Sequence, residues 1–272
     1  MTAAAINLIE YPWTFFGVLF VVLVCVVEVG YRLGSATGAN TNEDVRESLV
    51  STRDAVGLLV SLLLGFTLAM ALPRYEERKK LLVDEANAIG TTALRAQMLP
   101  EPARGKVLQL LSEYVDARLS FSTADVDGPE FQQSLARTKQ LQDQMWQQSV
   151  GVAQQNPTSI TSIFVQSLND SIDLTEKRLA TLENRVPNAV WLLLVLVSVL
   201  SCLTIGVSER RRFWFVMVMS PLTIAIVMAL IADLDAPRTG LIKIGQHSLR
   251  RVQQDLKSGG APRPDSSPRI PH

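Results

Sequence analysis

Few residues of this chain have the type and spacing that catalysis or metal binding requires. Only two histidines are present, His247 and His272, and no group of His, Cys, Asp and Glu has the spacing of metal ligands. The sequence also lacks a glycine-rich phosphate loop and a Gly-x-Ser-x-Gly nucleophile motif. We therefore expect that the protein is not an enzyme and that it uses no cofactor and no resident metal.

Two aspartates, Asp233 and Asp235, lie just past the last apolar run of the chain. Together with carbonyl oxygens they could coordinate a hard cation. They could equally form an ion pair with Arg74 or Arg78. Because two acids are few for a calcium site, we favour the structural ion pair.

One carboxylate, Glu28, interrupts the first apolar run. A carboxylate inside a membrane is energetically expensive and is often functional. Arg32 follows four residues later, one turn along a helix, where the two side chains can bridge. We favour an ion pair at the end of a membrane helix over a functional carboxylate.

Leu58, Leu62 and Phe66 repeat every four residues in the second apolar run and therefore share one helix face. Around a symmetry axis such a stripe would form stacked apolar rings, which can close a pore by dewetting. The same spacing suits ordinary contact with another helix or with lipid, and spacing alone favours that plainer interpretation.

These residues lie in a strongly apolar chain of 272 residues. Hydrophobic residues make up 47%, charged residues only 19%, and the mean hydropathy is +0.19. A hydrocarbon core of about 30 Å needs about 20 helical residues, and each of four uncharged runs comes close to that length or exceeds it. They cover residues 11–27, 55–73, 186–208 and 213–232. We predict an all-α integral membrane protein with four transmembrane helices, the first of them a retained span because no Lys or Arg precedes it.

Apolar periodicity predicts a helical bundle between the second and third spans. The residues expected to face inward recur at intervals of three and four: Leu82, Ala86, Ile89, Ala93 and Ala96. The expected organisation is 1–73 for the first two spans, 74–185 for the bundle, 186–257 for the last two spans and an amphipathic segment, and 258–272 for a disordered tail. We expect a loop over 34–53, and a helix that Asn156 caps and Pro157 begins.

Charge predicts the partners and the orientation. Lys+Arg and Asp+Glu number 26 each, so we expect no nucleic-acid binding, which needs a basic surface. Eleven Lys and Arg residues lie close to the membrane on the side of the bundle, against six on the other side. This excess predicts that the bundle and both termini are cytoplasmic in a cell inner (plasma) membrane, although Arg210, Arg211 and Arg212 in the short link argue the other way.

Several segments resemble a known family. Leu64-Gly65-Phe66, followed after seven residues by Arg74-Tyr75, resembles the end of the second membrane helix of bestrophins. Residues 74–78 and 84–90, Arg185-Val186-Pro187, and residues 233–240 resemble more closely a bacterial bestrophin-like membrane family. The similarity covers about residues 10 to 256.

The resemblance implies a function and a site. Bestrophins are pentameric ion channels with four membrane helices and a cytosolic helical body between the second and third. The resemblance places Leu58, Leu62 and Phe66 at the pore neck, although bestrophin necks carry more aromatic residues. Of the acidic calcium clasp that follows the fourth helix in bestrophins, this chain has only Asp233 and Asp235. We therefore expect a homo-oligomeric ion channel, a ring of copies in a lipid bilayer that conducts inorganic ions. The alternative is a non-conducting sensor or interaction module whose working surface is the Gln-rich bundle.

Overall fold

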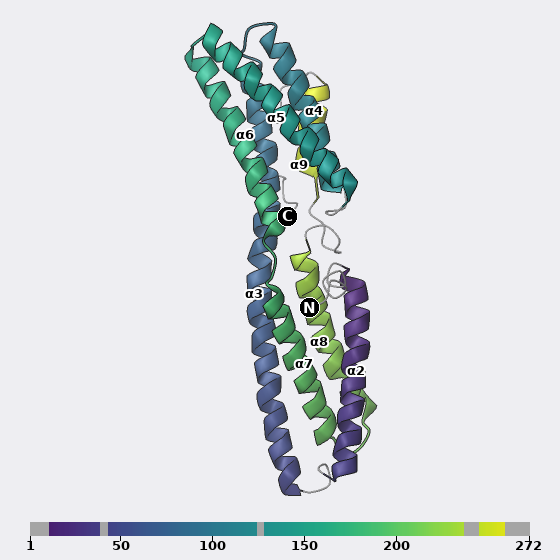
Figure 1. The fold of residues 1–272 in the computed structure, drawn as a ribbon. Coiled ribbons are helices and arrows are strands. Elements are labelled where there is room, and N and C mark those ends of the chain that lie inside the picture. The colour runs from purple at the N-terminus through teal and green to yellow at the C-terminus, as the bar shows by residue number, and fades with distance from the viewer. Residues whose placement is uncertain (1–10, 39–42, 124–127, 237–244, 259–272) are drawn as a thin grey trace, which may run out of the picture. The chain divides into compact units, whose positions relative to one another are not determined.

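A computed structural model describes residues 11–38, 43–123, 128–236 and 245–258 of the chain. The described residues form helices and connecting turns, with no strand among them. The predicted all-α class is therefore confirmed. Within these described ranges eight helices follow one another (Figure 1): α2 (Pro12–Thr37), α3 (Glu43–Ala96), α4 (Ala103–Thr123), α5 (Pro129–Gln155), α6 (Ser159–Glu183), α7 (Asn188–Ser208), α8 (Trp214–Asp235) and α9 (His247–Lys257).

Among the described residues, four helices are long and apolar enough to cross a membrane, and each overlaps one of the four predicted spans. They are Pro12–Thr37, Glu43–Ala96, Asn188–Ser208 and Met217–Asp235. Helix α3 is longer than its span, because it begins ten residues before Arg53 and continues through Pro73. The predicted loop over 34–53 is therefore wrong for most of its length. Glu43 and Asp44 occupy the first turn of α3, where acidic side chains stabilise the positive end of the helix dipole.

The chain divides into two compact units. The first contains residues up to Tyr75 and Asn184–Lys243, and the second contains Glu76–Glu183 and the residues from Ile244. Helix α3 contributes to both, and α9, which the sequence grouped with the last two spans, belongs to the second unit. The predicted disordered tail, apart from Ser258, lies outside the described residues.

The first unit is held together by close packing of α2 against α7. Gly30 and Gly34 of α2 face the backbone of α7, and Gly206 of α7 faces the backbone of α2. A Cβ atom at Gly30 would lie 2.5 Å from the carbonyl oxygen of Leu203, and one at Gly34 would lie 2.5 Å from that of Val207. Small residues allow the two backbones to approach closely and to gain van der Waals contact. Between membrane helices this contact matters because the hydrophobic effect does not drive their association. Around it lies a core with Leu23, Val27, Trp191, Met228 and Ile231.

The second unit buries the apolar positions that the periodicity predicted. Leu82, Ala86, Ile89, Ala93 and Ala96 are all buried. Helix α9 packs on α4 and buries Leu249 and Val252. The predicted cap of α6 is wrong, because the helix begins at Ser159, two residues later than expected, and the hydroxyl of Thr158 accepts the backbone N–H of Thr161 instead.

Candidate functional site

The predicted neck residues lie together on one exposed face of α3 in the first unit. Leu58, Leu62 and Phe66 are 72%, 50% and 64% exposed. The opposite face of the same helix is buried in the unit and carries Val60, Leu64, Thr67 and Ala71. At 100° per residue the two sets lie on opposite sides of the helix. The anchored face therefore fixes the rotation of α3, so that the stripe points away from its own unit.

A third face of α3 lines a groove. Gly57, Ser61 and Gly65, spaced four apart, border an open groove of about 520 Å³ with α7 and α8. A Cβ atom at Gly57 or Gly65 would meet no atom within 4 Å. The other polar residues that border the groove carry small hydroxyl side chains: Ser201, Ser220 and Thr223. Sequence reasoning missed this face, although its signal was the spacing of small residues one position before the neck stripe.

The aspartates after the last span are buried, and one of them holds a backbone group. Asp233 and Asp235 are each 5% exposed. Both carboxylate oxygens of Asp235 accept the backbone N–H of Val186, at 2.9 and 3.2 Å, just before α7 begins. An ion-pair or cation site shared by Asp233, Asp235 and Arg74 therefore stays a prediction. No cluster of three or more His, Cys, Asp or Glu that could hold a metal occurs in the part of the chain described.

The ion pair predicted between Glu28 and Arg32 is confirmed, and a second arginine joins it. Arg32 Nε lies 2.8 Å from Glu28 Oε1. Arg212 Nη2 approaches the same oxygen at 2.6 Å, and its guanidinium carbon lies 5.3 Å from the centre of the Tyr31 ring. The sequence could not show that the link after α7 returns an arginine to this carboxylate.

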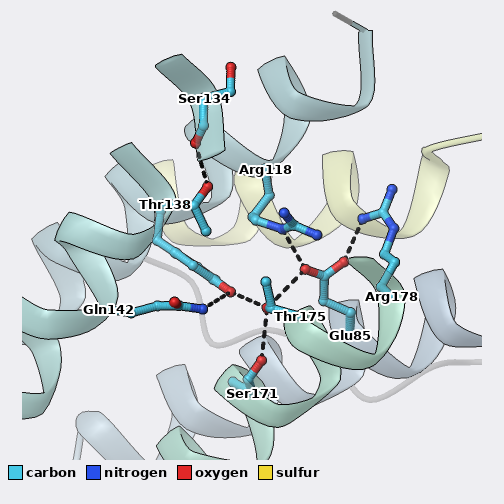
Figure 2. A network of polar contacts seen from close by, with 9 residues as sticks. Glu85, Arg118, Ser134, Thr138, Gln142, Ser171, Thr175 and Arg178 are labelled. Atoms are coloured by element: carbon cyan, nitrogen blue, oxygen red, sulfur yellow. Dashed lines mark hydrogen bonds and ion pairs between the residues drawn. The ribbon is translucent and has the colours of Figure 1, made fainter. Parts of the chain in front are cut away.

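A buried charge cluster in the second unit was not predicted at all. Glu85 of α3 and Arg118 of α4 have side chains with no exposed area. Arg118 Nε donates to Glu85 Oε1 at 2.6 Å, and Arg178 Nη1 of α6 donates to Glu85 Oε2 at 2.5 Å. Figure 2 shows the two guanidinium groups approaching the carboxylate from different helices. One carboxylate thus connects three helices.

Hydroxyl groups extend this cluster through the bundle core (Figure 2). Thr175 of α6 donates to Glu85 Oε1 at 3.2 Å and shares a hydrogen bond with the Tyr114 hydroxyl, which Gln142 of α5 also contacts at 3.4 Å. One turn earlier on α6, Ser171 is 2.9 Å from the hydroxyl of Thr92. Each of these polar groups is paired inside the core, as burial away from water requires.

The electrostatics of the cluster favour ionised side chains. Burial by itself raises the pKa of Glu85, but the charges of Arg118 and Arg178 and their hydrogen bonds outweigh it, so that the pKa is lowered overall. Burial, together with the Glu85 charge, raises the pKa of Tyr114. The phenol therefore stays neutral and the carboxylate stays charged, an arrangement that aligns helices and offers no acid, base or nucleophile to a substrate.

The sequence contained a signal for this cluster. Glu85 lies three residues after Leu82 and four before Ile89, so it is on the apolar face of its helix. A carboxylate on such a face requires a buried cationic partner. The spacing could not identify the partners, because Arg118 and Arg178 come from other helices.

Comparison with known proteins agrees with this architecture. Residues 17–249 match the family described as the Bestrophin-like domain. A crystal structure of a bacterial bestrophin homologue from Klebsiella pneumoniae superposes with a TM-score of 0.63 at 17% identity, over 90% of this chain and 98% of that one. A variant of a homologue from the same organism, with one tryptophan replaced by alanine, gives a TM-score of 0.65 at 14% identity, over 88% and 96%. No curated protein matches the sequence.

Proposed function

The chain belongs to the bestrophin-like family, and on that premise we propose that it is a homo-oligomeric ion channel whose pore is lined by α3. The observation that carries the proposal is the exposed stripe of Leu58, Leu62 and Phe66 opposite the anchored face of the same helix. In a ring of copies with these stripes turned inward, the three positions form successive apolar constrictions. Such a neck empties of water when narrow and conducts ions when the helices rotate or separate slightly.

The groove beside the stripe supports self-association. On α7 the small residues Ser198, Ser201 and Gly206 are buried and the exposed residues of the span are mostly leucines, the pattern of a helix whose outer face meets lipid. On α3, by contrast, Ser61 and Gly65 are exposed on the groove side. Small residues in membrane helices favour helix contacts rather than lipid contacts. We assign this groove to a neighbouring copy of the chain.

The remaining features of the proposal follow from the family. Bestrophins form rings of five, so five is the number we propose. We propose that the bundle and both termini are cytoplasmic and that the four spans cross the inner membrane, in keeping with the excess of Lys and Arg on the bundle side. For Asp233 and Asp235 we propose a structural role in place of a calcium site, because Asp235 already holds the backbone before α7.

The test is ion flux into liposomes that contain the purified full-length protein, after its subunit number in detergent has been measured. Leu62→Ala and Phe66→Ala widen the proposed neck and should raise the flux. Leu196→Ala and Leu200→Ala are matched controls, because they remove the same kind of exposed apolar side chain from α7. These two variants should conduct like the unmodified protein.

Two results would contradict the proposal. If the neck variants and the α7 variants conduct equally, α3 does not form the constriction. If an ordered oligomer conducts nothing in any variant, the protein is not a channel, and the non-conducting sensor or interaction module replaces it.

A further inference from the structure

The link between α7 and α8 carries a basic run followed directly by an aromatic one. Arg210, Arg211 and Arg212 precede Phe213, Trp214 and Phe215. All six are exposed, and Trp214 is 70% exposed. Rings of successive aromatic residues contact one another, with centroids 6.4 Å apart for Phe213 and Phe215 and 6.3 Å for Trp214 and Phe215. We call these six residues the link patch.

Positive charges outnumber negative charges around the link patch. Arg212 and Arg32 share one oxygen of Glu28, so two cations meet a single carboxylate. Arg210 and Arg211 form no ion pair with any described residue. Counting Arg53, which contacts Asp54 at 3.0 Å and Glu209 at 3.8 Å, five arginines face three acids at this end of the first unit.

Other acids on α3 do not reach the link patch. Glu43, Asp44 and Glu47 precede Arg53 by six to ten residues, which places them about 9–15 Å farther along the helix axis at 1.5 Å per residue. The nearer acids Glu28, Asp54 and Glu209 each contact an arginine already. A second copy of this link would bring further arginines rather than carboxylates.

We propose that the link patch binds the headgroup of an anionic phospholipid. Arg210 and Arg211 supply donors in the planar geometry that suits phosphate oxygens. The aromatic rings lie at the end of a membrane helix, where Trp side chains such as Trp214 anchor proteins at the boundary between headgroups and acyl chains. The complementary charge selects an anionic lipid over a zwitterionic one, and the rings hold that lipid beside the arginines.

The experiment measures quenching of Trp214 fluorescence by brominated lipids. Trp13→Phe and Trp146→Phe remove the two other exposed tryptophans and leave Trp191, which is 2% exposed. The full chain with these two changes is placed in phosphatidylcholine vesicles that contain the same small fraction of either brominated phosphatidylglycerol or brominated phosphatidylcholine. The phosphatidylglycerol should quench Trp214 more strongly.

Variants separate a specific site from general attraction. Arg210→Gln with Arg211→Gln should lower the preference for phosphatidylglycerol by about fivefold for each arginine removed. Lys106→Gln with Lys139→Gln removes the same charge from exposed residues of the second unit and should leave the preference unchanged. Equal quenching by both lipids, or an unchanged preference in the arginine variant, would overturn the proposal. So would the absence of quenching by either lipid, which would mean that a second copy covers Trp214.

Discussion

Replacing Glu85 by Gln tests whether the buried charge cluster holds the second unit together. The substitution keeps the shape of the side chain and removes its charge. Arg118 Nε then faces a neutral amide at the 2.6 Å that now separates it from a carboxylate oxygen, and Arg178 loses the same partner. Because the Arg118 side chain has no exposed area, water cannot replace the lost charge.

The expected loss follows from the cost of an uncompensated buried charge. Removing one partner of a buried ion pair costs about 3–5 kcal/mol. A destabilisation of 1 kcal/mol lowers the melting temperature by about 2–4 °C in a domain of 150–250 residues, so the loss should be about 6–20 °C. A surface change of the same chemistry should cost less than about 0.5 kcal/mol.

Thermal unfolding of the full chain in detergent measures this loss. Glu176→Gln is the matched control, since Glu176 is an exposed carboxylate on α6. A combined change of Glu85, Arg118 and Arg178 to Met removes all three charges and should be less harmful than Glu85→Gln alone, because an apolar replacement leaves no charge unpaired. If Glu85→Gln and Glu176→Gln melt together, the cluster does not stabilise the bundle and the reasoning fails.

The pH dependence of the same comparison gives an independent check. The pKa of Glu85 is lower in the folded protein than its ordinary value of 4.5. Its contribution to stability is therefore fully present above about pH 4.5 and is lost as the pH falls through the folded pKa. The difference between the unmodified protein and Glu85→Gln should stay constant at neutral pH and shrink only in acid. A difference that shrinks near pH 7 would contradict the assignment.

Two further substitutions test the packing of the first unit, both by melting temperature in detergent. Gly30→Ala should lower the free energy of unfolding by about 1–3 kcal/mol, because its Cβ atom would lie 2.5 Å from the carbonyl oxygen of Leu203. A Cβ atom at Gly17 would meet no atom within 4 Å, so Gly17→Ala should not lower the melting temperature. Equal losses of melting temperature in the two variants would refute the close approach of α2 and α7. Asp235→Ala should cost about 1–3 kcal/mol by leaving the N–H of Val186 without its acceptor. Asp235→Asn keeps an acceptor oxygen and should recover much of that loss, whereas an equally damaging Asn would show that the charge matters more.

The fold could be predicted because it depends on local and one-dimensional signals. Runs of apolar residues identify the spans, and the recurrence of Leu82, Ala86 and Ile89 identifies the buried face of the bundle. The start of α3 could not be placed in this way. Its first turns, from Glu43 to Arg53, are polar and helical, and polarity alone does not separate an exposed helix from a loop.

The candidate sites depended on contacts between distant segments, so the sequence identified them incompletely. Glu28 and Arg32 are one turn apart and their pairing could be foreseen, but Arg212 reaches the same oxygen from 184 residues away. Glu85 could be recognised as a carboxylate on an apolar face, yet its partners are 33 and 93 residues distant. No periodicity encodes which helix supplies a partner, since that choice is made by tertiary packing.

The surface of α3 within the first unit suits the proposal that this one helix lines a pore and also holds a ring of copies together. Val60 and Leu64 anchor it, Gly57 and Ser61 border an open groove, and Leu58 and Phe66 project outward. These faces follow one another around the helix, since consecutive residues are 100° apart. A helix that met only lipid would gain nothing from a small residue next to a large apolar one at every turn. A helix that contacts a neighbouring copy on one face and lines a shared axis with the adjacent face needs small residues on the first face and large apolar residues on the second. The proposed channel requires this combination of α3.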